Sequence, residues 1–140
     1  MSQSKGVTAT SLRPCKRYIT THKSSGESVY ADSPVQVYKG GIARSYSISS
    51  IPANLTDEAD IKAYKAETGP TSYRGRGIVN TEPGANLLVV DLLPGQSSAM
   101  HQTVSIDFSI CVVGEIDHEL DGGENVRLLP GVSRCRSLAC

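Results

Sequence analysis

The sequence predicts an all-β fold with one short helix. Three observations predict it: short runs in which apolar and polar residues alternate, Gly, Pro and Asp turn signals between these runs, and a single segment with a helical pattern. Alternation with a period of two is typical of strands that bury one face. About eight such strands in one chain predict a sandwich or a barrel.

Composition and charge limit the class of protein. The chain has 140 residues, 39% of them hydrophobic, which is enough for one domain with one core. The formal net charge is zero, so nothing favours nucleic acid or an anionic membrane as a partner. No apolar run approaches the ~18 residues of a membrane span, and residues 1–14 contain no apolar core of a secretory signal. We therefore expect a cytoplasmic protein.

Short strands after a flexible N-terminus are predicted in the first third of the chain. Residues 1–12 are polar and rich in Ser and Thr, and we expect them to be flexible. Residues 17–31 contain two β-rich runs around a polar turn with Gly, which predicts a β-hairpin. Residues 35–38 and 42–51 alternate apolar and polar side chains, so each predicts a further strand.

The single predicted helix begins near Thr56 and ends before Gly69. Thr56 is a suitable N-cap, and the acidic Asp57 and Glu58 favour a helix N-terminus. The Gly69-Pro70 pair ends the helical pattern.

The second half predicts strands separated by turn signals. An apolar strand is followed by the turn Pro94-Gly95, and a tight turn at residues 121–123 joins two later strands. The strands are predicted at residues 86–93, 100–113, 115–120 and 125–129.

The four cysteines do not have the spacing of a structural zinc site. None of them forms a CxxC pair, so we expect reduced thiols. Cys111 lies in an apolar run and is predicted to be a small core residue.

A motif in the second half resembles the first motif of the cupins. Gly95, five residues, His101, one residue, Thr103, three residues, Asp107, six residues and Gly114 follow the cupin order of Gly, His-x-His, an acid and Gly. The flanking text is similar to a subgroup of small single-domain cupins with a conserved barrel. The similar pieces are Leu93-Pro94-Gly95, Met100 to Asp107, Gly114 to Leu120, Asp121 to Glu124 and Leu128 to Gly131.

The resemblance covers residues 86–131 well and the N-terminal third loosely. It implies a cupin-type jelly-roll barrel. Many such proteins occur in fungi and bacteria, some beside natural-product pathways. Because cupins host many chemistries, the resemblance alone does not give a reaction.

Alternation places the candidate site residues on one face. His101, Thr103 and Ser105 share it, and Asp107 does so if no bulge intervenes. The resemblance implies that this face is the barrel interior, where cupins hold a divalent metal. This chain has Thr103 in place of the second His and Asp107 in place of Glu, so only His101 keeps a usual metal-ligand type. We expect no cofactor, or a divalent metal held weakly by His101.

The end of the chain lacks the second cupin motif. After Gly131 the sequence shows no apolar strand, no His and no Trp, so residues 132–140 are predicted to be a divergent tail on a barrel domain of residues 13–131. A jelly roll that is incomplete at its C-terminal end would expose unpaired sheet edges. We therefore expect a homodimer that pairs or exchanges strands, with residues 17–38 as the exchanged element.

The hypotheses for function remain open at this point. The first is a natural-product tailoring enzyme of the lyase or isomerase type that acts on a small organic acid or a polyketide-like molecule. His101 would be the general acid or base, and Asp107 would orient it or share its proton. The predicted substrate-binding residues are Thr103, Ser105, Arg44 and Tyr46. The alternatives are a non-catalytic cupin-like binding protein that has lost its metal site and dimerises, and a metal-dependent oxygenase.

Overall fold

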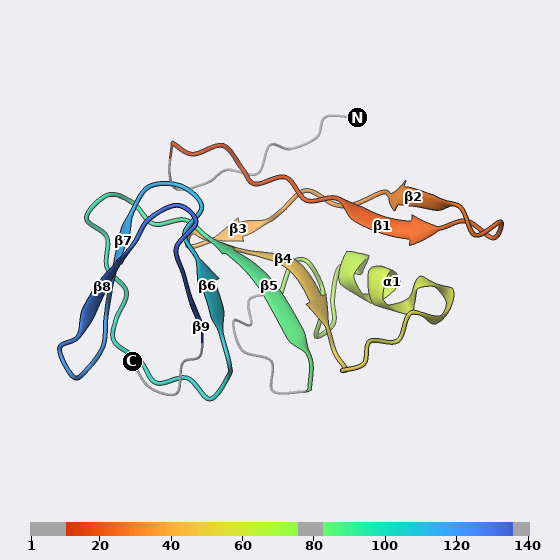
Figure 1. Ribbon diagram of the computed structural model, residues 1–140. Helices are drawn as coiled ribbons and strands as arrows, with labels where there is room; N and C mark the ends of the chain where they lie inside the picture. The colour runs from red at the N-terminus through yellow and green to blue at the C-terminus, as the bar shows by residue number, and fades with distance from the viewer. Residues whose placement is uncertain (1–10, 76–82, 136–140) are drawn as a thin grey trace. The chain divides into compact units, whose positions relative to one another are not determined.

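Strands and one short helix make up the computed structural model, which describes residues 11–75 and 83–135 (Figure 1). This confirms the predicted class of mostly β structure with one helix. The chain divides into a first unit, Met1–Gln96, and a second unit, Ser97–Cys140. None of the described helices is long and apolar enough to cross a membrane.

The first unit begins with the predicted hairpin. Strand β1 (Ile19–His22) pairs antiparallel with β2 (Ser28–Ala31), in the register that sets Ile19 opposite Ala31 (Figure 1). The connecting turn contains Gly26, whose φ of 83° suits glycine. The β-branched residues of the sequence therefore form the hairpin that they predict.

A three-stranded antiparallel sheet follows, in the order β3-β4-β5. Its strands are β3 (Tyr38–Lys39), β4 (Ile42–Ile48) and β5 (Ala85–Val90). The register between β4 and β5 shifts between Arg44 and Tyr46, so Ser45 is an extra residue in β4. Three consecutive side chains, Ala43, Arg44 and Ser45, are buried there. The simple alternation predicted for residues 42–51 is therefore wrong at this bulge.

The predicted helix exists, but it begins later than expected. A 3-10 turn, η1 (Thr56–Glu58), leads into α1 (Ala59–Lys65). Thr56 does not cap the helix with its side chain, and its N–H donates instead to the Asn54 side-chain oxygen. Asp57 and Glu58 have φ values of 51° and 57°, so these acidic residues lie outside the helix rather than in its first turn.

Tyr64 is at the centre of the first unit's core. Its side chain is fully buried and packs with Ile19, Ile61 and Tyr73. The Tyr64 hydroxyl donates to the backbone carbonyl of Arg44 at 3.0 Å and accepts a hydrogen bond from the guanidinium of Arg17. The Arg17 guanidinium also lies over the Tyr64 ring, 4.9 Å from the ring centroid.

Two arginines tie this core to the surrounding loops through backbone carbonyls. Arg17 donates to the carbonyls of Ser45 and Pro34. Arg44 donates from Nη1 to the carbonyls of Pro70, at 2.8 Å, and Ser72, at 3.1 Å.

Gly75 leaves the space that Arg44 occupies. A Cβ atom on Gly75 would lie 2.1 Å from Nη1 of Arg44. A side chain at this position would therefore displace the guanidinium from the space that it fills.

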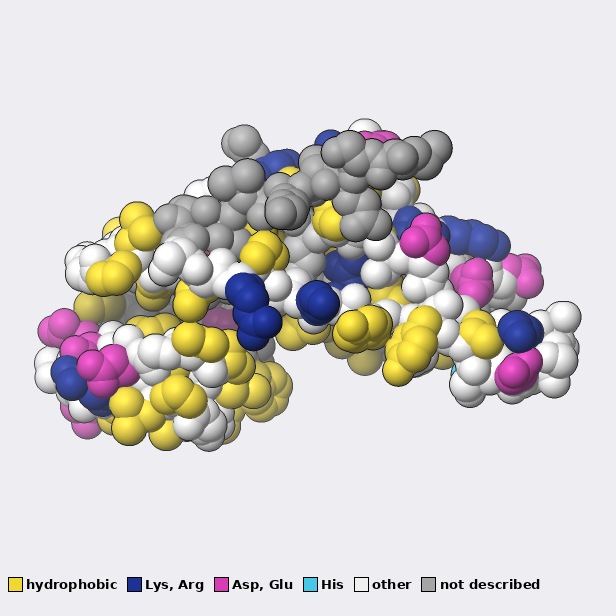
Figure 2. All heavy atoms as spheres, turned by 90° about the horizontal axis from the view of Figure 1, so that it is seen from above, with side chains coloured by type: hydrophobic (Ala, Val, Ile, Leu, Met, Phe, Trp, Pro, Cys, Tyr) yellow, Lys and Arg dark blue, Asp and Glu magenta, His cyan; other side chains and the backbone are white. Residues whose placement is uncertain are grey.

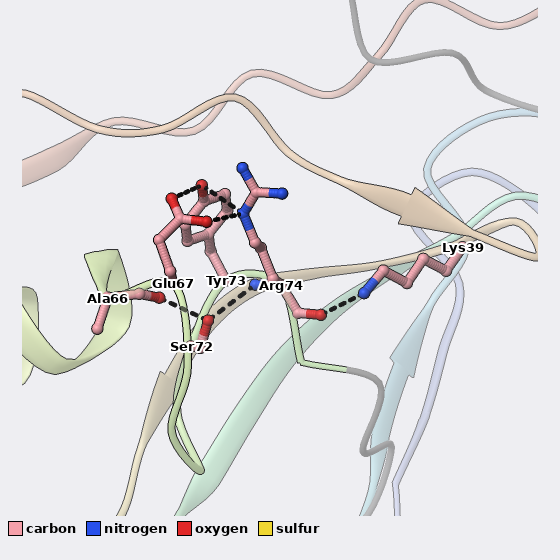
Figure 3. A network of polar contacts seen from close by, with 6 residues as sticks. All are labelled: Lys39, Ala66, Glu67, Ser72, Tyr73 and Arg74. Carbon is pink, nitrogen blue, oxygen red and sulfur yellow. Dashed lines mark hydrogen bonds and ion pairs between the residues drawn. The ribbon is translucent and has the colours of Figure 1, made fainter.

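A polar network fixes the segment that follows α1 (Figure 3). The Arg74 Nε lies 2.5 Å from a Glu67 carboxylate oxygen and donates to the Tyr73 hydroxyl at 2.8 Å. Ser72 Oγ donates to the Ala66 carbonyl, and Lys39 donates to the Arg74 carbonyl. The Ser72 carbonyl also accepts a hydrogen bond from the buried Arg44, so this network fixes one of the acceptors of Arg44.

The second unit consists of two strand pairs. Strand β6 (Phe108–Ile110) pairs with β9 (Ser133–Cys135), and β7 (Ile116–Glu119) pairs with β8 (Asn125–Leu128), both antiparallel (Figure 1). The strand predicted at residues 100–113 forms only as β6. Residues 133–135 form the short strand β9 inside the segment predicted as a divergent tail, although they are not an apolar run. The rest of the predicted tail, residues 136–140, lies outside the described residues.

The described strands form four separate sheets of two or three strands and not one closed barrel. The all-β class is therefore observed, while the jelly-roll closure stays a prediction. The predicted flexible N-terminus falls largely on residues 1–10, outside the described part.

The Tyr64 hydroxyl gives a first test. Tyr64→Phe removes one acceptor from Arg17 and one donor from the Arg44 carbonyl in a buried place, so we expect the free energy of unfolding to fall by about 1–3 kcal/mol. The matched control is Tyr30→Phe on the exposed face of β2. Urea unfolding followed by circular dichroism measures both variants. Equal stability of the two variants would show that the hydroxyl does not hold the core.

Candidate functional site

Polar side chains face inward along the motif segment of the second unit. Thr103, Ser105 and Asp107 are half-buried, as is Ser109 in β6. The alternate residues Val104, Ile106, Phe108 and Ile110 are exposed, by 90%, 69%, 78% and 62%. The face predicted to carry Thr103, Ser105 and Asp107 is therefore the less exposed one, although only residues 108–110 of this segment are strand.

Asp107 is the centre of a small cluster on this face. Its carboxylate accepts a hydrogen bond from Ser105 Oγ at 2.9 Å, and its other oxygen accepts one from Thr103 Oγ1 at 3.5 Å. Two hydroxyl donors fix the orientation of the carboxylate. The arrangement gives Asp107 the geometry of a proton acceptor whose position does not depend on His101.

His101 lies apart from this cluster. Its ring is exposed, and Nδ1 is 2.9 Å from the carbonyl oxygen of Ala99. Because a carbonyl only accepts, Nδ1 carries a proton in this contact and Nε2 points away from it. Within the described residues His101 and Asp107 form no hydrogen bond, so a direct pair between them is not formed.

Arg44 and Tyr46, predicted to bind substrate, have partners inside the first unit. Arg44 is 4% exposed and donates to two carbonyls, and burial lowers its pKa. The Tyr46 hydroxyl donates to Asp60 at 2.6 Å, and burial together with this carboxylate raises the pKa of Tyr46. Both side chains therefore have contacts that stabilise the core, and their role with a ligand stays a prediction.

The donor set does not assemble into a metal site. In residues 11–75 and 83–135, no three His, Cys, Asp or Glu side chains come close enough to hold a metal ion. The described members of the predicted site offer one exposed imidazole and one carboxylate already bonded to hydroxyls, which does not fit the N/O set of a divalent transition metal. A metal bound through His101 stays a prediction.

The cysteines that the structure describes are free thiols. Cys111 is buried, which confirms its prediction as a core residue, whereas Cys15 and Cys135 are exposed. Cys140 lies outside the described residues.

Sequence reasoning missed Arg134. It pairs in register with Ser109 across β6 and β9, and both side chains are half-buried. The inward polar row therefore continues from Asp107 through Ser109 to Arg134. In the structure Arg134 is half-buried between the exposed Ser133 and Cys135. A run of three polar or small residues carries no alternation from which this could be predicted.

His118 is close enough to Arg134 for the charge of the arginine to act on its ring. It is half-buried on β7, and burial first, then the positive charge of Arg134, lower the pKa of His118 below its ordinary value of 6.5. The sequence left open whether His118 faces a cavity; the structure sets it within the electrostatic reach of Arg134.

The pKa of His118 gives a second test. Arg134→Gln removes a positive charge beside the ring, so we expect the pKa of His118 to rise toward 6.5. Arg127→Gln, an exposed arginine on β8, is the matched control and should leave it unchanged. NMR titration of the ring protons measures both. Identical His118 titrations in the wild type and in Arg134→Gln would contradict the expectation.

The same shift has a consequence for stability. Because the folded-state pKa of His118 lies below the unfolded value, the unfolded chain binds more protons between the two values. The contribution of His118 to the free energy of unfolding is therefore fully present above pH ~6.5 and is lost as the pH falls through the folded-state pKa.

Comparison with known proteins identifies relatives. No family model matches the chain. It is 37% identical over 136 residues to phomopsin biosynthesis cluster protein D of Diaporthe leptostromiformis, in a match that covers 89% of this chain and 67% of the relative. Phomopsin biosynthesis cluster protein C' of the same organism is 36% identical, with the same coverage. The cupin-domain-containing oxidoreductase fogC of Aspergillus ruber is 27% identical over 82% of this chain and 56% of the relative.

The chain thus spans about two thirds of the length of the phomopsin proteins and less of fogC. The match to the phomopsin proteins covers nearly all of this chain, and the match to fogC carries the cupin name that the Gly95 to Gly114 motif predicts. The chain belongs to the family of biosynthesis-cluster proteins that the two phomopsin proteins represent, and it is similar to the cupin-domain-containing protein fogC.

Proposed function

We propose that this chain is a cupin-type jelly-roll protein that carries out acid–base chemistry on a small organic acid or a polyketide-like molecule. Dehydration, decarboxylation, isomerisation or cyclisation would all use the same groups. The observation that carries the proposal is the half-buried carboxylate of Asp107, oriented by Ser105 and Thr103. The relatives in biosynthesis clusters support a place in natural-product metabolism.

The proposed step is a proton transfer. Asp107 removes a proton from the carbon next to a carbonyl group of the ligand, and the electron pair of the broken C–H bond becomes an enolate. His101 takes up a proton at Nε2 from solvent and delivers it to the ligand at another atom, and Asp107 releases the abstracted proton to solvent, so both groups return to their starting state. Thr103 and Ser105 hold the carboxylate in place and donate to ligand oxygens when their hydroxyl groups turn. The names of fogC and its counterparts describe those proteins as oxidoreductases; the step proposed here needs no oxidant.

Proton exchange tests this function without knowledge of the substrate. The full chain is incubated in D2O with 2-oxobutanoate and with acetoacetate, and loss of the C–H signal is followed by NMR. We expect exchange above the buffer rate, and a loss of about 10²-fold or more in Asp107→Asn, since a positioned acid or base contributes this much. His101→Gln should also lower the rate.

The control variant is His22→Gln, an exposed histidine on β1, which should exchange both probes at the wild-type rate. An Asp107→Asn protein as active as the wild type, or a wild type no faster than buffer, would contradict the proposal.

A second candidate, a binding protein that acts as a homodimer, is favoured by the outward apolar row. This row consists of Val104, Ile106, Phe108, Ile110, Val112 and Val113, and each side chain is at least 59% exposed. Figure 2 shows hydrophobic side chains at the surface. At roughly 60–120 Å² of apolar area for each side chain, the six side chains expose about 360–720 Å², compared with the ~800 Å² per partner of a standard interface.

We propose a second copy of this chain as the occupant of the row. The row contains no charged side chain and the chain has zero net charge, so two copies meet without electrostatic repulsion. A two-fold axis would set the same row against itself.

Light scattering coupled to size exclusion tests the dimer at micromolar concentration. We expect twice the chain mass for the wild type and the monomer mass for Phe108→Asp, because a charge in the row is desolvated on pairing. The control is Leu55→Asp, an exposed apolar residue just before η1 and outside both the row and residues 17–38, which should stay dimeric. A monomeric wild type would overturn the dimer.

A further inference from the structure

Arg134 continues the inward polar row of the second unit but takes no part in the cluster around Asp107. It lies in β9 opposite Ser109 of β6. Its neighbours Ser133 and Cys135 are exposed, together with their partners Ile110 and Phe108, so the strand pair has a polar inward face and a largely apolar outward face. The Arg134 guanidinium lies on the polar inward face.

The partners of Arg134 differ from those of the exposed Arg127. Arg127 Nε and Nη2 donate to the two oxygens of Asp117, at 2.8 and 3.0 Å, and Glu115 lies 3.8 Å away. Arg134 has a buried Nε with no hydrogen-bond partner and forms no ion pair within the described part of the chain. A buried N–H donor of a cation without an acceptor lowers the stability of the fold, so stability alone does not explain why Arg134 Nε lies there.

A carboxylate satisfies this donor in the way that Asp117 satisfies Arg127. The planar guanidinium offers Nε–H and one Nη–H in parallel, which matches the two oxygens of a carboxylate. His118 lies within reach of the Arg134 charge, and its lowered pKa keeps the ring neutral near pH 7, so it adds no second positive charge beside Arg134. The site therefore selects one negative group.

The position of this site relative to Asp107 fits the proposed chemistry. Ser109, the register partner of Arg134, is two residues from Asp107, which is about 7 Å along an extended chain. A carboxylate held at Arg134 would bring a carbon a few bonds away toward Asp107. Since Asp107 is itself an anion, it repels a carboxylate at its own position and favours the orientation in which the acid group lies at Arg134.

We propose that Arg134, with His118 beside it, binds the carboxylate of a small organic acid on the inward face of the second unit. The turnover of that acid rests on the proposed function, but its binding does not.

The test uses the full chain labelled with 15N and benzoate as the probe, with benzamide as its neutral counterpart. We expect benzoate to shift the Arg134 Nε–H and His118 ring signals in a saturable way, and benzamide not to. Arg134→Gln should weaken benzoate binding at least tenfold, Arg134→Lys should weaken it less because the charge is kept, and Arg127→Gln should bind as the wild type does. Circular dichroism checks that each variant is folded.

Three results would overturn the site: no saturable benzoate binding by the wild type, equal binding of benzamide, or unchanged binding in a folded Arg134→Gln. The wild-type comparison of benzoate with benzamide remains decisive if Arg134→Gln does not fold. Asp107→Asn separates this inference from the proposed function. If the chain binds benzoate but shows no proton exchange that depends on Asp107, the carboxylate site is supported and the acid–base function is wrong. If proton exchange depends on Asp107 but benzoate binding does not depend on Arg134, the acid–base function is supported and the carboxylate site is wrong.

Discussion

The Arg17 guanidinium, donating to the Tyr64 hydroxyl and to the carbonyls of Ser45 and Pro34, is the interaction on which the first unit depends. Among the described residues, the buried apolar core around it has four members, Ile19, Ile61, Tyr64 and Tyr73. Apolar burial over so few side chains contributes little, so the hydrogen bonds that Arg17 and Arg44 donate to backbone carbonyls hold much of the first unit together. The first unit is thus held by directional contacts, in which a small displacement leaves a charged donor unpaired.

Local patterns in the sequence were enough to predict local elements. The hairpin β1–β2 and the helix α1 follow from residues that are neighbours in the chain, and both are present. The bulge at Ser45 and strand β9 were missed, because each is created by a partner that is distant in sequence: β5 for the bulge and β6 for β9. Closure into a jelly roll depends on still more distant pairings and stays a prediction.

The candidate site shows the same division. The inward face of Thr103, Ser105 and Asp107 could be predicted from a period of two, and the hydroxyl contacts to Asp107 agree with it. His101 departs from the face because its segment is not strand and its ring bonds to the nearby Ala99 carbonyl. Arg134 could not be predicted from the sequence, since only its pairing with Ser109 makes it part of the inward polar row. The family relationship supports the cupin character of this segment, and the individual contacts decide which side chains can act together.

The fit between Gly75 and Arg44 has an evolutionary consequence. Since a Cβ at position 75 would lie 2.1 Å from Nη1 of Arg44, the two positions are coupled. A side chain at position 75 would force the guanidinium out of its present place, whereas a shorter residue at position 44 would leave room for it. Covariation of this pair across related sequences would therefore mark which members of the family retain a buried cation in this core and which have replaced it by ordinary packing.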